Sequence, residues 1–243
     1  ANNLSKKLGE YLLFDWESQS EIRKSDFYLW NKKNTWVEDY SIFMFLREKF
    51  NMLPWWEWPL EFKQKENEFI KTWIKDKKNE ILKTKLIQWH LDKQWKEIKV
   101  FAKTNGITLI GDLPFYVSRD SVDVWSNKSL FSISQNGDLL YQSGVPPDYF
   151  SSTGQLWGTP TYYWAKHKST AFRWWRKRFK RQFELVDILR LDHFRALAGY
   201  WRVDGNAQNA INGSWINSPG KELLNILKKD LKSDYLPIIA EDL

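Results

Sequence analysis

The decapeptide VDILRLDHFR, residues 186–195, constrains the fold more than any other stretch of the chain. Residues two apart share one face of a strand, so its leucines point to one side while Arg190 and Asp192 point to the other. Charged groups on a buried strand are costly unless they are paired or used. The segment therefore predicts a buried strand with either an ion pair or a site in which Arg190 and His193 keep Asp192 ionised.

Length and composition indicate a globular chain. It has 243 residues, of which 42% are apolar, enough for one large domain with a sizeable core. It contains no run of 18 apolar residues and no basic-then-apolar leader, so we expect no membrane partner and no secretory signal. The absence of cysteine excludes disulfides and fits a reducing cytoplasm, which is the compartment we expect. The three scattered histidines give no metal-ligand spacing, so no metal site is predicted.

A basic segment at residues 172–183 offers another interpretation, because the chain carries a net charge of +7. On a helix, Phe172, Trp175, Phe179 and Phe183 lie three or four residues apart and form one apolar stripe. Most of the basic residues then fall on the solvated side. We therefore favour a core helix over phosphate binding and expect no nucleic-acid partner.

The first hundred residues are predicted to be helical or irregular. The first forty alternate aromatic and polar residues without a sustained period, which predicts loop and short helix and no strand. A helix is predicted over residues 38–50, and a packed hydrophobic corner over 54–59, where two prolines bracket three tryptophans. A long helical tract over 65–104, broken at 75–80, ends at the stop signal Asn105-Gly106.

Three predicted strands each end in an acidic residue. The strands are predicted over residues 107–112, 186–192 and 236–242. Helices are predicted over residues 170–184 and 219–231, the second capped by Ser218. In parallel strands with right-handed crossovers, the carboxyl ends meet at one edge. Asp112, Asp192 and Glu241 are therefore expected side by side.

Two carboxylates at neighbouring strand ends are what glycosidic chemistry requires, one to attack the anomeric carbon and one to protonate the leaving oxygen. Asp192 has cationic neighbours in the sequence, so it should stay ionised and act as the nucleophile. Glu241 follows an apolar run, so desolvation should raise its pKa as a general acid requires. Alternatively, such acids cap helices or bind loop amides, which would explain any one of them but poorly explains all three.

Residues 113–168 are predicted to be loop with at most a small hairpin. Such an excursion is too long for a linker and is typical of functional loops. Aromatic side chains stack on sugar rings, so aromatic residues on this loop indicate a sugar-binding cleft. The loop aromatics are Tyr116, Tyr149, Phe150, Trp157, Tyr162 and Tyr163.

Four segments resemble, in the same order, the signature segments of the 4-α-glucanotransferases, also called amylomaltases or disproportionating enzymes. They are GDLPFYVSRDSVDVW (111–125), SGVPPDYFSSTGQLWGTP (143–160), RLDHFR (190–195) and IIAEDL (238–243). PWWEWP and QWHLDKQW extend the resemblance over much of the chain. It implies an α/β fold, a partial (β/α)8 TIM barrel of the α-amylase clan with long irregular active-site loops and helical insertions. Residues 1–243 would form a single partial catalytic barrel, with 113–168 as its active-site loop.

The resemblance also implies roles, position by position. Asp192 matches the catalytic nucleophile and Glu241 the acid/base. Arg190 and His193 resemble the residues that surround the nucleophile and the bound glucose, and Asp112 resembles the acid that ends the third strand. The remaining implied glucan contacts lie on the mobile loop over the acceptor groove and are Asp148, Tyr149, Phe150 and Trp157.

The implied activity is transfer of α-1,4-glucan segments between malto-oligosaccharides, or on starch- or glycogen-derived α-glucans, by a retaining double displacement without cofactor or metal. Thr159 stands where the family usually has Asn. Family members also carry a Ser-Pro-Tyr loop and a third carboxylate in a His-Asp pair, which this sequence lacks. We therefore expect an internal piece of such an enzyme that is inactive alone. A retaining α-glucan hydrolase and a non-catalytic glucan-binding fragment remain as alternatives.

Overall fold

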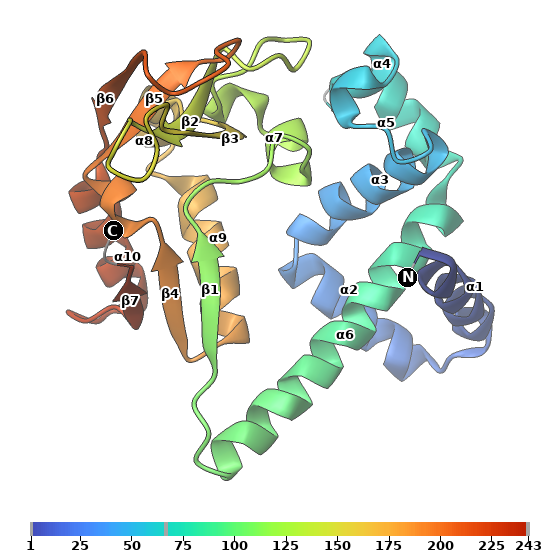
Figure 1. The fold of residues 1–243 in the computed structure, drawn as a ribbon. Coiled ribbons are helices and arrows are strands. Elements are labelled where there is room, and N and C mark those ends of the chain that lie inside the picture. Colours follow the sequence, from blue (N-terminus) through green and yellow to red (C-terminus); the bar gives the residue numbers. More distant parts are fainter. Residues whose placement is uncertain (1, 66–67, 242–243) are drawn as a thin grey trace. The chain divides into compact units, whose positions relative to one another are not determined.

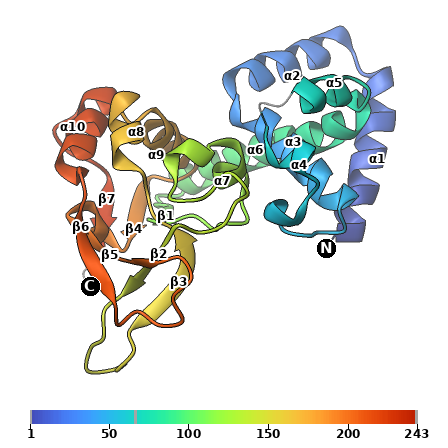
Figure 2. The same ribbon diagram turned by 90° about the horizontal axis from the view of Figure 1, so that it is seen from above.

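The computed structural model describes residues 2–65 and 68–241 of the chain, which Figures 1 and 2 draw from two sides. The chain forms two compact units, residues 1–98 and residues 99–243. The first unit is built of helices, and the second combines helices with two sheets. In the described residues, no helix is both long enough and apolar enough to cross a membrane.

The first unit is more regular than its sequence predicts. Its helices are α1 (Asn2–Ser18), α2 (Glu21–Lys33), α3 (Trp36–Lys49), the 3-10 helix η1 (Trp55–Glu57), α4 (Leu60–Lys63), α5 (Glu68–Lys75) and the first part of α6 (Lys78–Thr104). The prediction of loop and short helix for the first forty residues is wrong, because two long helices and the start of a third occupy them. Tertiary packing of a few aromatic residues stabilises these helices where the sequence period is weak.

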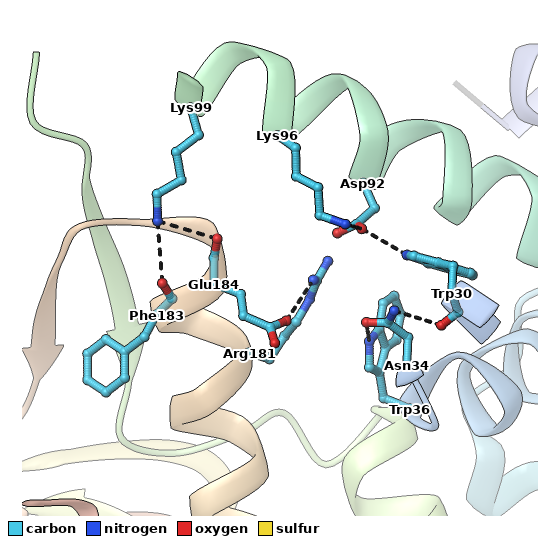
Figure 3. A network of polar contacts seen from close by, with 9 residues as sticks. All are labelled: Trp30, Asn34, Trp36, Asp92, Lys96, Lys99, Arg181, Phe183 and Glu184. Atoms are coloured by element: carbon cyan, nitrogen blue, oxygen red, sulfur yellow. Dashed lines mark hydrogen bonds and ion pairs between the residues drawn. The ribbon is translucent and has the colours of Figure 1, made fainter. Parts of the chain in front are cut away.

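One aromatic cluster forms part of the core of the first unit. It consists of Leu12, Trp16, Phe27, Trp30, Val37, Leu86 and Trp89. The buried carboxylate of Asp92 accepts a hydrogen bond from Trp30 Nε1 at 2.8 Å and pairs with Lys96 Nζ at 2.6 Å (Figure 3). Asn34 Nδ2 donates to the Trp30 carbonyl at 2.8 Å, which satisfies the end of α2. The buried Asp92 carboxylate and Asn34 amide are thus paired, as buried polar groups generally must be.

Other predictions for this region are confirmed. Helix α3 occupies the predicted helix at 38–50, and α5 and α6 are separated by a turn inside the predicted break at 75–80. Trp55 and Trp58 are almost fully buried, so the segment between the two prolines is a packed corner. Gly106 has a φ of +69° after the end of α6, the left-handed conformation that terminates a helix.

The second unit contains the predicted three-stranded parallel sheet. Strands β1 (Ile110–Pro114), β4 (Ile188–Asp192) and β7 (Ile238–Ala240) lie in the order β1-β4-β7, and both pairs are parallel. Each strand starts two or three residues later than predicted. Asp112 is in register with Arg190, and Pro114 with Asp192. The three acidic strand ends therefore meet at one edge, as predicted.

The apolar face of this sheet is covered by a helix. Leu113, Leu189 and Leu191 are buried, and α9 (Arg173–Leu185) packs on β1 and β4. Figures 1 and 2 show α9 on one side of the sheet with α10 (Gly220–Leu231) beside it. The buried Trp175 and Phe179 of α9 confirm the predicted apolar stripe.

The N-terminus of α10 does not follow the prediction. Pro219 stands at the cap position without a side-chain hydrogen bond, and among the described residues the buried hydroxyl of Ser218 has no hydrogen-bond partner. A Cβ at Gly220 would lie 2.1 Å from the carbonyl oxygen of Leu197. Close packing on the 3-10 helix η3 (Phe194–Leu197), rather than a serine cap, therefore places this helix.

Lys99 joins three segments of the second unit. Its ammonium donates to the carbonyls of Phe183 and Glu184, both at 3.4 Å (Figure 3), and of Val186 at 2.9 Å. It also pairs with Asp187 at 3.5 Å. A cation on the last carbonyls of a helix stabilises its C-terminus, so Lys99 fixes the end of α9 where β4 begins.

The second sheet has four antiparallel strands, in the order β3-β2-β5-β6. They are β2 (Tyr141–Val145), β3 (Gln155–Pro160), β5 (Gly199–Asp204) and β6 (Gly213–Asn217). The hairpin of β2 and β3 is the small hairpin predicted within 113–168, and Figure 1 shows this sheet beyond the arrowheads of β1 and β4. Neither β5 nor β6 is among the strands predicted from the sequence. Three short helices follow β1 or β3 in the chain: α7 (Val122–Ser126) and the 3-10 helix η2 (Lys128–Leu130) after β1, and α8 (Trp164–Ser169) after β3.

Candidate active site

Five predicted site residues meet at the carboxyl edge of the parallel sheet. Asp112 lies on β1, Arg190 and Asp192 on β4, His193 directly after β4, and Glu241 directly after β7. The backbone N–H of Glu241 donates to the Leu191 carbonyl at 3.2 Å, which aligns the two strand ends. Strand alternation turns the leucines of β4 into the core and leaves its charged residues on the other face.

Arg190 is the centre of this cluster. Its Nη1 donates to Asp112 Oδ1 at 2.8 Å, and its Nη2 contacts Asp192 Oδ1 at 3.4 Å. The same Nη2 donates to Glu241 Oε1. One guanidinium therefore contacts three carboxylates, and the four side chains together carry a negative charge. An arrangement of this kind couples the protonation of neighbouring acids.

His193 turns the chain away from β4 in a strained conformation. Its φ of 53° and ψ of 47° lie in the left-handed region, which non-glycine residues seldom adopt and which is frequent at functional sites. This turn directs its backbone N–H to Glu241 Oε2 at 2.5 Å. The imidazole is buried against Trp157, with ring centroids 5.0 Å apart, and its Nε2 has no hydrogen-bond partner in the described part of the chain.

The two acids have pKa shifts opposite to those predicted. The His193 N–H, followed by the hydrogen bond with Asp192 and then the charge of Arg190, lowers the pKa of Glu241. Partial burial, and then the hydrogen bond and charge of Glu241, raise the pKa of Asp192 although Arg190 opposes this. The predicted pKa shifts rested on residues that are neighbours along the chain. The pairing of β4 with β7 instead directs the strongest donors of β4 to the acid of the adjacent strand.

The predicted glucan-binding loop is partly regular. Residues 146–154 are irregular, and the flanking residues belong to β2 and β3, the small hairpin predicted within 113–168. Asp148 Oδ1 accepts from the N–H groups of Phe150 at 2.9 Å and Ser151 at 2.7 Å, which shapes the turn. Tyr149 and Phe150 are 98% and 93% exposed and pack edge to face on each other. They are free to meet a ligand, as a role in binding requires.

Trp157 connects this hairpin to the strand ends. It is 37% exposed, its Nε1 donates to Gln155 Oε1 at 3.2 Å, and its ring touches His193. The structure thus brings Trp157 to the five strand-end residues, while Asp148, Tyr149 and Phe150 lie on the loop before it. Thr159 pairs its hydroxyl with Ser143 at 2.5 Å across the hairpin, so this departure from the family pattern has a local structural partner.

Two residues at the end of β1 were not predicted as part of the site. The rings of Phe115 and Tyr116 lie 6.5 and 6.0 Å from the His193 ring, between centroids. Tyr116 appeared among the loop aromatics, but nothing in the sequence placed either ring beside His193. The one sequence feature that could have indicated their place in the site is their position directly after a strand that carries an acid near its end.

Positive charge between the acids comes from the chain itself. Within residues 2–65 and 68–241, no group of three or more metal-binding side chains is arranged to hold an ion. The guanidinium of Arg190 lies where Asp112, Asp192 and Glu241 converge. A planar guanidinium is suited to hydrogen-bond several carboxylates at once.

Parallel strands with helices on one face and charged residues at their carboxyl ends define an α/β fold of the barrel type, and solved structures share it. The chain is similar to an amylomaltase from Streptococcus agalactiae in complex with acarbose, with a TM-score of 0.85 and 37% identity over 92% of this chain and 45% of that one. An amylomaltase from Corynebacterium glutamicum has the same fold at a TM-score of 0.66 and 18% identity, covering 93% of this chain and 29% of that one. The predicted fold class, a partial TIM barrel, is confirmed.

Sequence comparison gives the family. The sequence model of the 4-alpha-glucanotransferases matches residues 5–243, and the chain belongs to this family. It is 43% identical to the 4-alpha-glucanotransferase of Synechocystis over 87% of this chain, and 43% identical to that of Clostridium butyricum over 86%. In both cases the chain spans 42% of the relative's length.

Proposed function

We propose that this chain carries the nucleophile and the acid/base of a 4-α-glucanotransferase, which moves α-1,4-glucan segments between malto-oligosaccharides by a retaining double displacement. The observation that carries the proposal is the contact of Arg190 with Asp112, Asp192 and Glu241 at the ends of three parallel strands. Membership of the family supports the same activity.

In the proposed reaction, Glu241 protonates the glycosidic oxygen while Asp192 attacks the anomeric carbon and forms a covalent glycosyl-enzyme. Glu241 then removes the proton from the 4-hydroxyl of an acceptor sugar, which attacks the same carbon and releases Asp192. Net bonding is conserved, because one α-1,4 bond breaks and one forms. The carboxylate of Asp112 and the guanidinium of Arg190 would hold the sugar and the two catalytic acids in place.

The pKa shifts of the pair run against the roles that the proposed first step requires. In the ligand-free protein the pKa of Asp192 is raised and that of Glu241 is lowered. The first step needs Asp192 ionised and Glu241 protonated, so the bound sugar must reverse both shifts. We infer that a sugar which draws Glu241 away from the His193 N–H raises the pKa of Glu241.

We propose malto-oligosaccharides and starch- or glycogen-derived α-glucans as substrates, with Asp148, Tyr149, Phe150 and Trp157 as contacts beside the strand-end residues. The exposure of Tyr149 and Phe150 supports this. The solved amylomaltase of Streptococcus agalactiae is in complex with acarbose. We propose that this chain binds ligands of the same class.

We further propose that residues 1–243 form one catalytic region with 113–168 as its active-site loop, because the family match crosses both compact units. Neither nucleic acid nor a membrane is a proposed partner, and no cofactor is needed. The proposed compartment is the cytoplasm, which a cysteine-free sequence fits.

The test uses the natural polypeptide that contains residues 1–243, with maltotriose as the only substrate. Transfer should produce glucose and a ladder of longer maltodextrins while the total of reducing ends stays constant. A rise in reducing ends would show hydrolysis instead and would favour the α-glucan hydrolase. Binding without either product would leave only a glucan-binding role. Asp192→Asn, which keeps the shape of the side chain, is the control and should abolish the ladder.

A further inference from the structure

Arg178, on α9, is a cation close to the candidate active site. It has no role in the proposed reaction. We propose that Arg178 is a positioning residue, which fixes the end of β1 and thereby keeps His193 bound to Glu241. Its meaning for catalysis rests on the proposed function, but the geometry itself can be tested without activity.

The guanidinium of Arg178 is held by carbonyl groups and aromatic rings. Its Nη2 donates to the Pro114 carbonyl at 2.7 Å, and its Nη1 donates to the Phe115 carbonyl at 3.2 Å. It lies 5.3 Å from the ring centroids of both Trp174 and Trp175. Burial lowers its pKa, although Tyr162 and Asp123 favour the charged form. Arg178 is half-buried, and its guanidinium is held by two carbonyls and two rings, so it fixes the position of these carbonyls.

The Phe115 carbonyl is fixed from a second direction. Tyr162 Oη donates to the same oxygen at 2.6 Å, so two side chains from different segments fix one peptide group. Phe115 and Tyr116, which flank this same peptide group, are the residues whose rings pack on His193. A shift of this segment would therefore be transmitted to the His193 ring.

His193 in turn controls Glu241. Its left-handed backbone, with φ of 53°, directs the N–H to Glu241 Oε2 at 2.5 Å, and this bond is the largest cause of the lowered pKa of Glu241. The other charged or titratable groups that face Glu241 are Arg190, Asp192 and the imidazole of His193. If Arg178 is removed, the strand end loosens, the His193 N–H leaves the carboxylate, and the pKa of Glu241 rises.

The experiment is a carboxyl titration by carbon-13 NMR on the ligand-free natural polypeptide that contains residues 1–243. Arg178→Met should raise the pKa of Glu241 by about 0.5 or more, as expected when one hydrogen bond to the ionised form is lost. Arg178→Lys, which can reach one of the two carbonyls, should show a smaller rise. Arg176→Met is the matched control, because Arg176 pairs with Asp230 at 2.6 and 2.7 Å, away from β1, and should leave Glu241 unchanged.

A folded Arg178→Met protein with the wild-type pKa at Glu241 would overturn the proposal, because a merely structural role does not alter this titration. If Arg178→Met does not fold, Tyr162→Phe removes the other donor to the same carbonyl. A raised Glu241 pKa in that variant would support the proposal, and an unchanged one would overturn it.

In the transfer assay, Arg178→Met should lower kcat/KM roughly tenfold through misplacement of the acid and move the basic limb of the pH profile upward, because Glu241 must be protonated to act. Absence of transfer in the wild type would reject the proposed function, and the titration would still decide the role of Arg178.

Discussion

The backbone N–H of His193 donates to Glu241 Oε2 at 2.5 Å and so joins the end of β4 to the end of β7. This bond combines two properties of the site. It uses the strained turn after β4, and it stabilises the ionised form of the acid that we propose as proton donor. The pKa of ligand-free Glu241 is therefore shifted away from what a proton donor requires, and the bound sugar must reverse this shift.

Removal of the central cation should raise both carboxyl pKa values. Arg190 lowers the pKa of Asp192 and of Glu241, so Arg190→Gln should move both titration steps upward in the ligand-free protein. Because the groups are coupled, the observable is the pair of macroscopic steps in a carbon-13 NMR titration. Steps that stay in place would show that Arg190 does not set the charge state of the site.

His167 should make the protein sensitive to mild acid. Its ring is fully buried, its Nε2 contacts the Leu130 carbonyl at 3.1 Å, and burial lowers its pKa from 6.5 to about 4. Below pH 6.5 the imidazole of His167 is protonated in the unfolded chain but stays neutral in the folded protein. Stability therefore falls between pH 6.5 and about 4. The full loss is about 3 kcal/mol.

The measurement is urea unfolding as a function of pH, with His167→Phe as the comparison. The phenylalanine ring suits the surrounding aromatic rings but cannot titrate, so this part of the pH dependence should vanish. An unchanged slope in His167→Phe would assign the acid sensitivity to other groups.

Gly144→Ala should disrupt the hairpin that carries Trp157. A Cβ at this position would lie 2.2 Å from the Gln155 carbonyl oxygen, so β2 and β3 must separate. We expect a loss of about 2 to 4 kcal/mol in the free energy of unfolding, in the range of severe backbone clashes. Gly106→Ala is the control, since Gly106 has a positive φ but open space around it and should lose only about 1 kcal/mol. Equal losses would show that the close approach is not what requires glycine.

Lys99→Met should loosen the end of α9. The ammonium bonds the last carbonyls of the helix and pairs with Asp187, so its removal should cost about 1 to 2 kcal/mol. Hydrogen exchange at residues 182–186 should accelerate. Lys177→Met, an exposed change on the same helix, should remain within about 0.5 kcal/mol of the wild type. Unaltered exchange in Lys99→Met would contradict a capping role.

The parallel strands were predictable because each combines an apolar run with an acidic end, as Leu189, Leu191 and Asp192 show. Strand β5 was not predicted, since its side chains do not alternate in burial: Tyr200 and Val203 are buried while Trp201 and Arg202 between them are only partly covered. The long N-terminal helices were missed for a similar reason, because their stability comes from contacts such as Trp16 with Phe27 rather than from a sequence period.

The composition of the site was predictable and its electrostatics were not. Asp112, Arg190, Asp192, His193 and Glu241 were all expected at one edge, and they lie there. Which acid is held ionised depends on cross-strand register, which the local sequence does not contain. Trp157 was expected as a loop residue, but its contact with His193 follows from the pairing of β2 with β3 and β5.

The central claim is that Asp192 forms the covalent bond to the sugar. The most direct test incubates Glu241→Gln, in the natural polypeptide that contains residues 1–243, with an α-maltosyl fluoride, whose leaving group needs no protonation. Loss of the acid/base should slow the second step, so the glycosyl-enzyme accumulates and can be located by peptide mass spectrometry. We predict the added mass on Asp192, and none when Asp192→Asn is also present. Label on Asp112 or another residue, or full turnover by the Asp192→Asn protein, would contradict the account.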